Sequence, residues 1–151
     1  MRKIFILTIV LLSLVSQAFA VSVKEYSLEK LSKDSPLIVR VKCSEIHFIS
    51  EAGITKRVYT FAIQEIIKGN HGENSIKVKT LKNAEKLQLV PQMSVGDEAV
   101  IFFTNTLKIK GLKQGYVKLT KDTKTKKMYA SYRDKTYTYE TLEVEIKKFI
   151  Q

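Results

Sequence analysis

The sequence predicts a mainly β protein, a small barrel of five or six strands with a short helix before the strands and an amphipathic helix after them along the chain. Three observations support this prediction. Over most of the chain, apolar residues alternate with polar ones, which is the period of a half-buried strand. Helical spacing is confined to two short segments, and runs rich in glycine, asparagine and aspartate separate the alternating stretches, as turns do. A β-sandwich is the alternative architecture.

The first twenty residues, MRKIFILTIVLLSLVSQAFA, are predicted to be a cleaved export signal. Two basic residues precede an apolar run of roughly a dozen residues, which is too short to cross a hydrocarbon layer of about 30 Å. Ala18 and Ala20 place small residues where signal peptidase reads, so cleavage before Val21 is expected. An uncleaved anchor would need a longer apolar run. We therefore expect one domain, residues 21–151, exported to the periplasm or the extracellular medium and not transmembrane after processing.

The predicted helices flank the strands. Ser27 can cap a short helix that carries Leu28 and Leu31 and that Pro36 prevents from continuing. Near the end of the chain, apolar residues at i, i+4, i+7 and i+8 form one stripe on a helix of about ten residues. These residues are Leu142, Ile146, Phe149 and Ile150.

The first predicted strand begins at Leu37 and carries the single cysteine of the chain. Val39, Val41 and Cys43 alternate with polar residues and are expected to face inward. After Glu45 the alternation slips by one residue, which is typical of a β-bulge in a bent strand. Cys43 is therefore expected to be a small core residue at the bend rather than a reactive thiol.

Three further strands are predicted at 58–67, 76–78 and 98–103. The residues expected to point inward from the first of these are Tyr59, Phe61 and Ile63. The segment 98–103 is apolar at most positions, so it is expected to be central, with Phe102 in the core.

A hairpin is predicted after these strands. Its two arms are 116–119 and 128–132, and a lysine-rich tip, 121–127, joins them. One bent strand followed by a closed meander fits a five-stranded OB-type barrel, in which closure removes the open edges.

The formal net charge is +11, and nearly all of the positive charge is lysine. Beyond the predicted signal, the chain has only three arginines: Arg40, Arg57 and Arg133. Such a charge can attract an exported protein to anionic polymers or acidic partners, but a surface dominated by lysine more often serves solubility and the protection of sheet edges. Arginine is the usual residue for bidentate phosphate recognition, so its shortage, together with export, disfavours nucleic acid as the ligand.

Several segments resemble a group of exported bacterial domains that are similar to the netrin and tissue-inhibitor-of-metalloproteinase (NTR-like) OB fold. The segments are SLEKLSKDSPLIVRVKCSEI, VYTFAIQEIIKG, VGDEAVIFF and GLKQGYVKL. Lys68-Gly69, Val95-Gly96-Asp97 and the Gly111–Gly115 segment match the pattern, whereas the glycine expected near Arg40 is absent. The resemblance implies an OB-like domain and raises protease inhibition as a distant alternative. Inhibitors of that fold use an N-terminal cysteine on the catalytic zinc, and this chain would begin with Val21.

The search for catalytic chemistry finds no nucleophile elbow, phosphate loop or dinucleotide fingerprint. His47, His71 and Cys43 do not have the spacing of a zinc site, so neither a metal nor a cofactor is expected. We predict a non-catalytic domain. An unrecognised envelope hydrolase that uses His71 is the alternative.

The predicted function is binding, because the last third of the chain interleaves tyrosines with cations. Aromatic and cationic side chains on one face of a small β domain can stack sugars and attract anions. Cross-strand packing is the favoured role of the tyrosines, and ligand binding is the alternative; the partner expected for a ligand-binding role is an anionic envelope polymer or another exported protein. The candidate binding residues are Tyr116, Lys118, Lys127, Tyr129, Tyr132 and Arg133.

Overall fold

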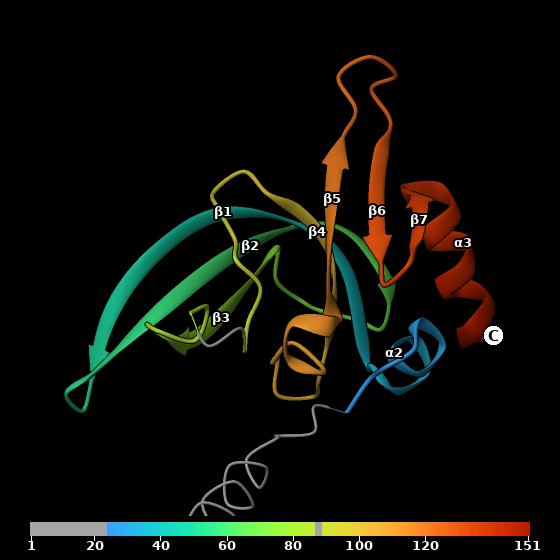
Figure 1. Ribbon diagram of the computed structural model, residues 1–151. Helices are drawn as coiled ribbons and strands as arrows, with labels where there is room; N and C mark the ends of the chain where they lie inside the picture. The colour runs from blue at the N-terminus through green and yellow to red at the C-terminus, as the bar shows by residue number, and fades with distance from the viewer. Residues whose placement is uncertain (1–23, 87–88) are drawn as a thin grey trace, which may run out of the picture.

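The computed structural model describes residues 24–86 and 89–151, so the predicted signal and its cleavage positions lie outside the described residues. Within these ranges, seven antiparallel strands form one sheet in the order β3-β2-β1-β4-β5-β6-β7 (Figure 1). The strands are β1 (Leu37–Glu51), β2 (Ile54–Lys68), β3 (Ser75–Leu81), β4 (Glu98–Phe103), β5 (Tyr116–Lys121), β6 (Met128–Tyr132) and β7 (Lys135–Thr138). The helices are α2 (Leu28–Asp34) and α3 (Tyr139–Ile150), with a short 3₁₀ helix, η1 (Leu112–Gly115). The mainly β class, with one helix before the strands and one after them along the chain, is confirmed.

The strand count and the closure differ from the expectation. The sheet has seven strands, and its edge strands β3 and β7 stand at opposite ends of the order, so the described sheet is open rather than a closed barrel. It is also one sheet, which excludes the two-sheet sandwich for these residues. The additional strand is β7, which pairs with β6 from Tyr129↔Thr138 to Tyr132↔Lys135 and leads directly into α3.

The predicted bulge in the first strand is confirmed. Cys43 pairs with Phe61, whereas Glu45 pairs with Thr60, so Ser44 is an extra residue in β1. A bulge of this kind bends a strand and increases its twist. The long β1–β2 hairpin accordingly sweeps in an arc away from β5, β6 and β7, and β3 pairs along its β2 arm (Figure 1).

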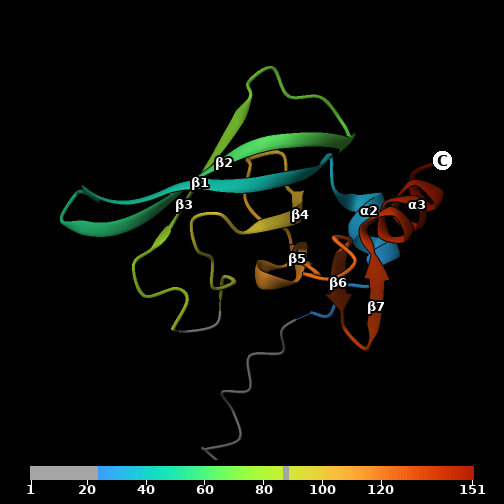
Figure 2. The ribbon, with the colours of Figure 1, turned by 90° about the horizontal axis from the view of Figure 1, so that it is seen from above.

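The sheet carries a hydrophobic cluster on each face. On one face, α2 and α3 pack against β4, β5 and β6, and Figure 2 shows both helices on the same side of β6 and β7. On the other face, the curled β1, β2 and β3 enclose a second cluster that Met93 and Ile109 help to cover. β4 contributes to both clusters, so the prediction that it is central is correct.

The residues expected in the core occupy both clusters. Phe102 belongs to the helix-side cluster, and Ile63 is partly buried and packs against the second cluster. The expected residues that are buried in the second cluster are Val39, Val41, Cys43, Tyr59 and Phe61. Cys43 is 1 % exposed, and its burial raises the pKa of the thiol.

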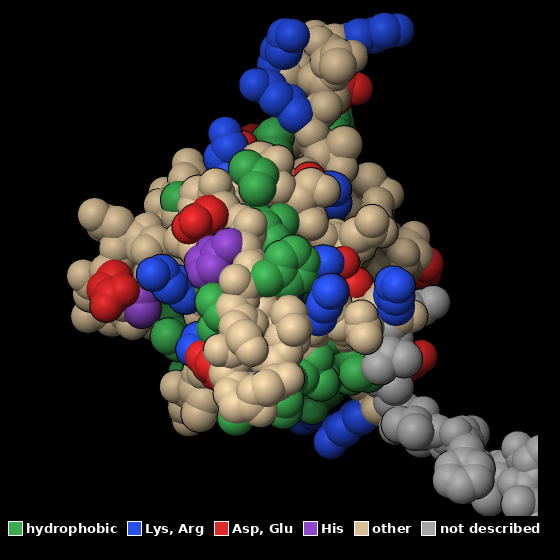
Figure 3. All heavy atoms as spheres, turned by 90° about the vertical axis from the view of Figure 1, so that its left-hand side faces the viewer, with side chains coloured by type: hydrophobic (Ala, Val, Ile, Leu, Met, Phe, Trp, Pro, Cys, Tyr) green, Lys and Arg blue, Asp and Glu red, His purple; other side chains and the backbone are tan. Residues whose placement is uncertain are grey.

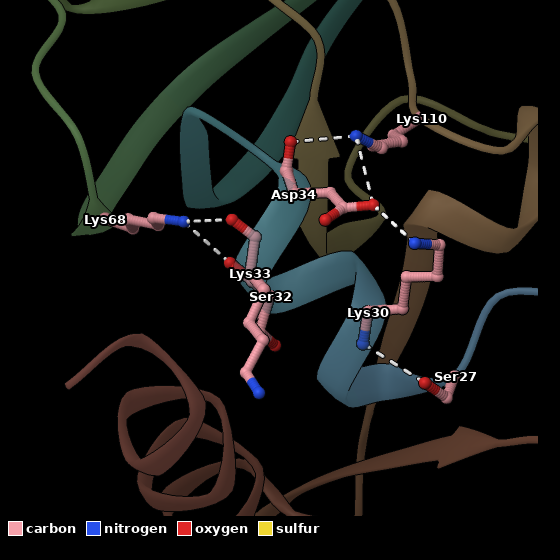
Figure 4. A network of polar contacts seen from close by, with 7 residues as sticks. All are labelled: Ser27, Lys30, Ser32, Lys33, Asp34, Lys68 and Lys110. Carbon is pink, nitrogen blue, oxygen red and sulfur yellow. Dashed lines mark hydrogen bonds and ion pairs between the residues drawn. The ribbon is translucent and has the colours of Figure 1, made fainter.

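Both ends of α2 are satisfied by side chains (Figure 4). The hydroxyl of Ser27 accepts the backbone N–H of Lys30 at 3.1 Å, which is the predicted cap. At the other end, Lys68 Nζ donates to two carbonyls of the last turn at 2.7 and 2.9 Å, and Lys110 Nζ donates to the carbonyl of Asp34 at 2.8 Å. Cations are favourable at a helix C-terminus, so these lysines fix α2 to β2 and to the segment before η1.

None of the helices in residues 24–86 and 89–151 is long and apolar enough to cross a membrane.

Candidate functional site

The β5–β6 hairpin and the turn that follows it carry all six candidate binding residues. The hairpin projects from the body of the molecule (Figure 1). Leu119 pairs with Ala130, and both are buried toward the helices. Because side chains alternate along a strand, the neighbouring residues of these two strands point to the opposite face.

Three of the candidates share that opposite face, which we call the open face. Tyr116 and Lys118 pair with Ile101 and Ala99 of β4, whose side chains belong to the second cluster, and Tyr129 pairs with Thr120 of β5. The residues of the open face on β5, β6 and β7 are Tyr116, Lys118, Thr120, Tyr129, Ser131, Thr136 and Thr138. This face therefore combines aromatic rings, hydroxyls and one cation.

The ammonium group of Lys118 forms an ion pair within the protein, so its charge is not fully available to a ligand. Its Nζ lies 2.9 Å from Oδ1 of Asp97 and donates to Oδ2 of the same carboxylate at 3.0 Å. Asp97 precedes β4 and also accepts the backbone N–H of Ser94 at 2.9 Å. The ion pair joins β5 to the entry of β4, and the carboxylate of Asp97 offsets the positive charge of Lys118.

The hairpin tip, residues 121–127, concentrates positive charge at the far end of the hairpin. It contains four lysines and one aspartate, and Figure 3 shows basic side chains gathered at the top of the molecule, where the hairpin projects. The carboxylate of Asp122 accepts the backbone N–H groups of Lys124 and Thr125 at 2.8 and 2.6 Å, and these bonds lower its pKa. The aspartate thus shapes the turn, while the four lysine side chains of the tip make no ion pair within 4 Å among the described residues.

A hollow of about 260 Å³ lies at the other end of the hairpin, between η1 and the turn after β6. We call it the basal pocket. Its lining residues are Lys113, Gln114, Tyr116, Tyr132 and Arg133. It brings together three of the six candidates and adds two residues that the sequence did not single out. The only sequence signal for these two is the Gly-Leu-Lys-Gln-Gly segment, which indicated a turn.

Tyr132 faces the helix side of the sheet rather than the open face. It is buried among the helix-side residues, and its hydroxyl donates to the carbonyl of Tyr26 at 2.6 Å. Burial raises its pKa, and the nearby guanidinium of Arg133 opposes that rise. The ring is therefore held rigidly at the wall of the basal pocket.

The three arginines of the described chain have different surroundings. Arg40 binds Glu98 at 2.8 Å and stacks on the ring of Tyr139 at 4.5 Å, so its guanidinium is used within the fold. Arg57 is likewise paired with Glu85. The side chain of Arg133 is 43 % exposed, and its ion-pair partner, Glu25 at 3.5 Å, is itself 82 % exposed.

Arg133 also has an unusual backbone conformation. It begins the two-residue turn between β6 and β7 with a φ of +56°, in the left-handed region. Asparagine and glycine are the usual residues at such a position. An arginine here is strained, which is more common at functional sites than elsewhere.

The histidines and the cysteine do not gather into one site. His71 Nε2 lies 3.2 Å from the carbonyl of Ser75, and His47 Nδ1 lies 3.4 Å from Oε1 of Glu45. In residues 24–86 and 89–151, no three His, Cys, Asp or Glu side chains come together as a metal site requires.

Comparison with protein families finds no family that matches the chain, and comparison with curated proteins finds no match either. The similarity to the NTR-like OB fold therefore stays a prediction that rests on the segments quoted from the sequence.

Proposed function

We propose that this protein is an exported, non-catalytic binding domain that holds an anionic envelope component on its β5–β6 hairpin. The observation that carries the proposal is the hairpin tip. Four lysines without ion pairs in the described structure project from the molecule on a turn that Asp122 shapes from within.

The lysines of the tip are suited to attract a polyanion. Elsewhere in the described chain, many lysines are neutralised by carboxylates, among them Lys30, Lys56, Lys79 and Lys147. Lysine ammonium groups act as point charges without a fixed direction, so several on one turn favour a repeating anion over one specific group. Because the ammonium groups are exposed, salt will screen the attraction strongly.

The tip does not have the composition of a membrane-inserting loop. Residues 121–127 are lysine, threonine and aspartate, without an aromatic or aliphatic side chain. Segments that insert into the bilayer interface need apolar residues that enter it. The tip is therefore not expected to insert into a bilayer, and the proposed ligand is a polymer in solution or in the cell envelope.

The test is the salt dependence of binding to an immobilised polyanion. We expect Lys124→Gln together with Lys127→Gln to weaken retention and to reduce the slope of log K against log salt by about two, or about one per lysine. The matched control is Lys42→Gln together with Lys77→Gln, which removes the same charge from two exposed lysines on β1 and β3. Equal slopes for the two double variants would refute the assignment of binding to the tip.

Export is tested separately. We expect the N-terminus of the protein recovered from the periplasm or the medium to be Val21, and an intact N-terminus at Met1 would contradict this part of the proposal.

A further inference from the structure

We propose that the basal pocket is a second subsite for the same ligand and accepts one acidic sugar residue, so that the ligand is an acidic polysaccharide. This inference rests on the proposed function of the hairpin tip, and it names the chemistry of the polymer that the tip attracts.

The lining of the basal pocket suits an acidic sugar ring. The half-buried ring of Tyr116 and the small exposed part of Tyr132 supply aromatic surface, and sugar rings have apolar C–H faces that pack against such surface. Arg133 and Lys113 supply positive charge at the same hollow, which suits a carboxylate. The hollow has a volume of about 260 Å³ and is open to solvent, so one sugar ring can lie in it while the rest of a chain continues outside.

Arg133 is the arginine that is available to a ligand. Arg40 and Arg57 are each paired with a carboxylate within the fold, whereas Arg133 is opposed only by a largely exposed glutamate in the described structure. The guanidinium can bind a carboxylate through two parallel hydrogen bonds, which lysine cannot do.

The open face connects the basal pocket to the hairpin tip. Tyr116 and Lys121 bound β5, and six residues of a strand span about 20 Å. The surface between them carries hydroxyl groups on all three strands and the ring of Tyr129. Hydroxyls and one aromatic ring can contact sugar hydroxyls and ring faces, and a ligand must be a polymer to reach both ends at once.

This arrangement favours an acidic polysaccharide over a phosphate polymer. A phosphate chain would be attracted to the lysines of the tip and to Arg133, but it has no apolar ring face that can pack against the tyrosine rings. An acidic polysaccharide uses the charge at both ends and the neutral surface between them. Polyphosphate is therefore the discriminating competitor in the test.

The experiment measures binding by tyrosine fluorescence, since the chain contains seven tyrosines and no tryptophan. The probes are an oligogalacturonate of about ten residues, digalacturonate and polyphosphate of the same charge as the longer oligomer. The variant is Arg133→Asn, because asparagine tolerates the left-handed conformation. The control is Lys77→Asn, which removes one exposed charge from β3.

We expect the long oligogalacturonate to bind at least tenfold more tightly than digalacturonate. We expect Arg133→Asn to weaken binding of the long oligomer about fivefold or more, to weaken polyphosphate binding clearly less, and to leave the unfolding midpoint unchanged or higher. Lys77→Asn is expected to change neither affinity. Loss of sugar binding in a variant that folds at least as well cannot be explained by damage to the fold.

Two results would overturn the inference. The first is an oligogalacturonate affinity that is unchanged in Arg133→Asn. The second is polyphosphate binding that is as tight as oligogalacturonate binding and that Arg133→Asn weakens equally. If the double variant of the tip lowers binding of both polymers while Arg133→Asn lowers neither, the proposed function stands and the pocket inference fails. If the double variant of the tip has no effect on either polymer, the proposed function itself fails.

Discussion

The close approach of β2 to the start of β1 can be tested with one methyl group. Gly69 follows β2 with a φ of +84°, and a Cβ added there would lie 2.3 Å from the carbonyl oxygen of Pro36 and 3.3 Å from Cα of Leu37. Both of these are backbone atoms, so they cannot rotate away as a side chain can. Gly53, in the β1–β2 turn, has a φ of +76° but meets nothing within 4 Å. It is a matched control with the same backbone strain and open space.

The two substitutions differ in one contribution only. Forcing alanine into a left-handed conformation costs roughly 1–2 kcal/mol at either position. At Gly69 the methyl group must also displace the first residues of β1, which pair with β4 from Leu37↔Phe103 onward. Overpacking of this kind typically costs about 1–3 kcal/mol more. Gly69→Ala should therefore lose about 2–5 kcal/mol of the free energy of unfolding, and Gly53→Ala about 1–2 kcal/mol.

Urea unfolding of both variants measures the difference. We expect the midpoint of Gly69→Ala to fall further than that of Gly53→Ala, with the m-value unchanged. Equal losses would show that Pro36 does not lie against Gly69, and the start of β1 would then have to be placed elsewhere.

Three further predictions concern the core and the ion pairs. Arg40→Met should destabilise the protein by about 2–3 kcal/mol, because it leaves the carboxylate of Glu98 without its partner and removes the stacking on Tyr139. In a double-mutant cycle, the added change Glu98→Gln should recover part of this loss. The pKa of Glu51 is lowered to about 2, mainly by the hydrogen bonds that it accepts from Lys56 and Lys79. The contribution of Glu51 to stability is therefore fully present above the ordinary carboxyl pKa of 4.5 and is lost as the pH falls through 2. Glu51→Gln should flatten that part of the acid unfolding curve. Cys43 should react with a thiol reagent at least about 10³-fold more slowly in the native protein than in the unfolded protein. The reason is that the side chain is 1 % exposed and that global unfolding requires about 5 kcal/mol or more. Fast labelling without denaturant would contradict the position of Cys43 in the core.

Much of the fold could be predicted from local patterns. The slip in alternation after Glu45 predicted the bulge at Ser44, and the apolar run at 98–103 predicted the bounds of β4. The edge strand β7 was missed because it is four residues long and because Thr138 both ends the strand and caps α3. Openness of the sheet could not be predicted, since alternation shows which residues of a strand face inward but not which strands meet at the edges.

The candidate site was harder to predict because its residues come together from different elements. Alternation placed Tyr129 and Tyr132 on one hairpin arm, but two residues that are three positions apart on a strand point to opposite faces of the sheet. The pairing of Lys118 with Asp97 joins residues 21 positions apart, and the basal pocket depends on η1 meeting the turn at Arg133. Such contacts depend on the order of the strands rather than on any local pattern.

The separation of the hairpin tip from the basal pocket has a consequence for how they act together. They are about 20 Å apart along β5, whereas the Debye length is about 8 Å at physiological ionic strength. Electrostatic coupling between the two through solvent is therefore weak, and a polymer that touches both sites provides the connection. Changes at the tip and at Arg133 should then add in free energy for a long polymer, because neither side chain contacts the other. For a disaccharide, which cannot span the distance, the change at the tip should have little effect on binding in the pocket. A small anion whose affinity depended equally on both sites would exclude this two-site arrangement.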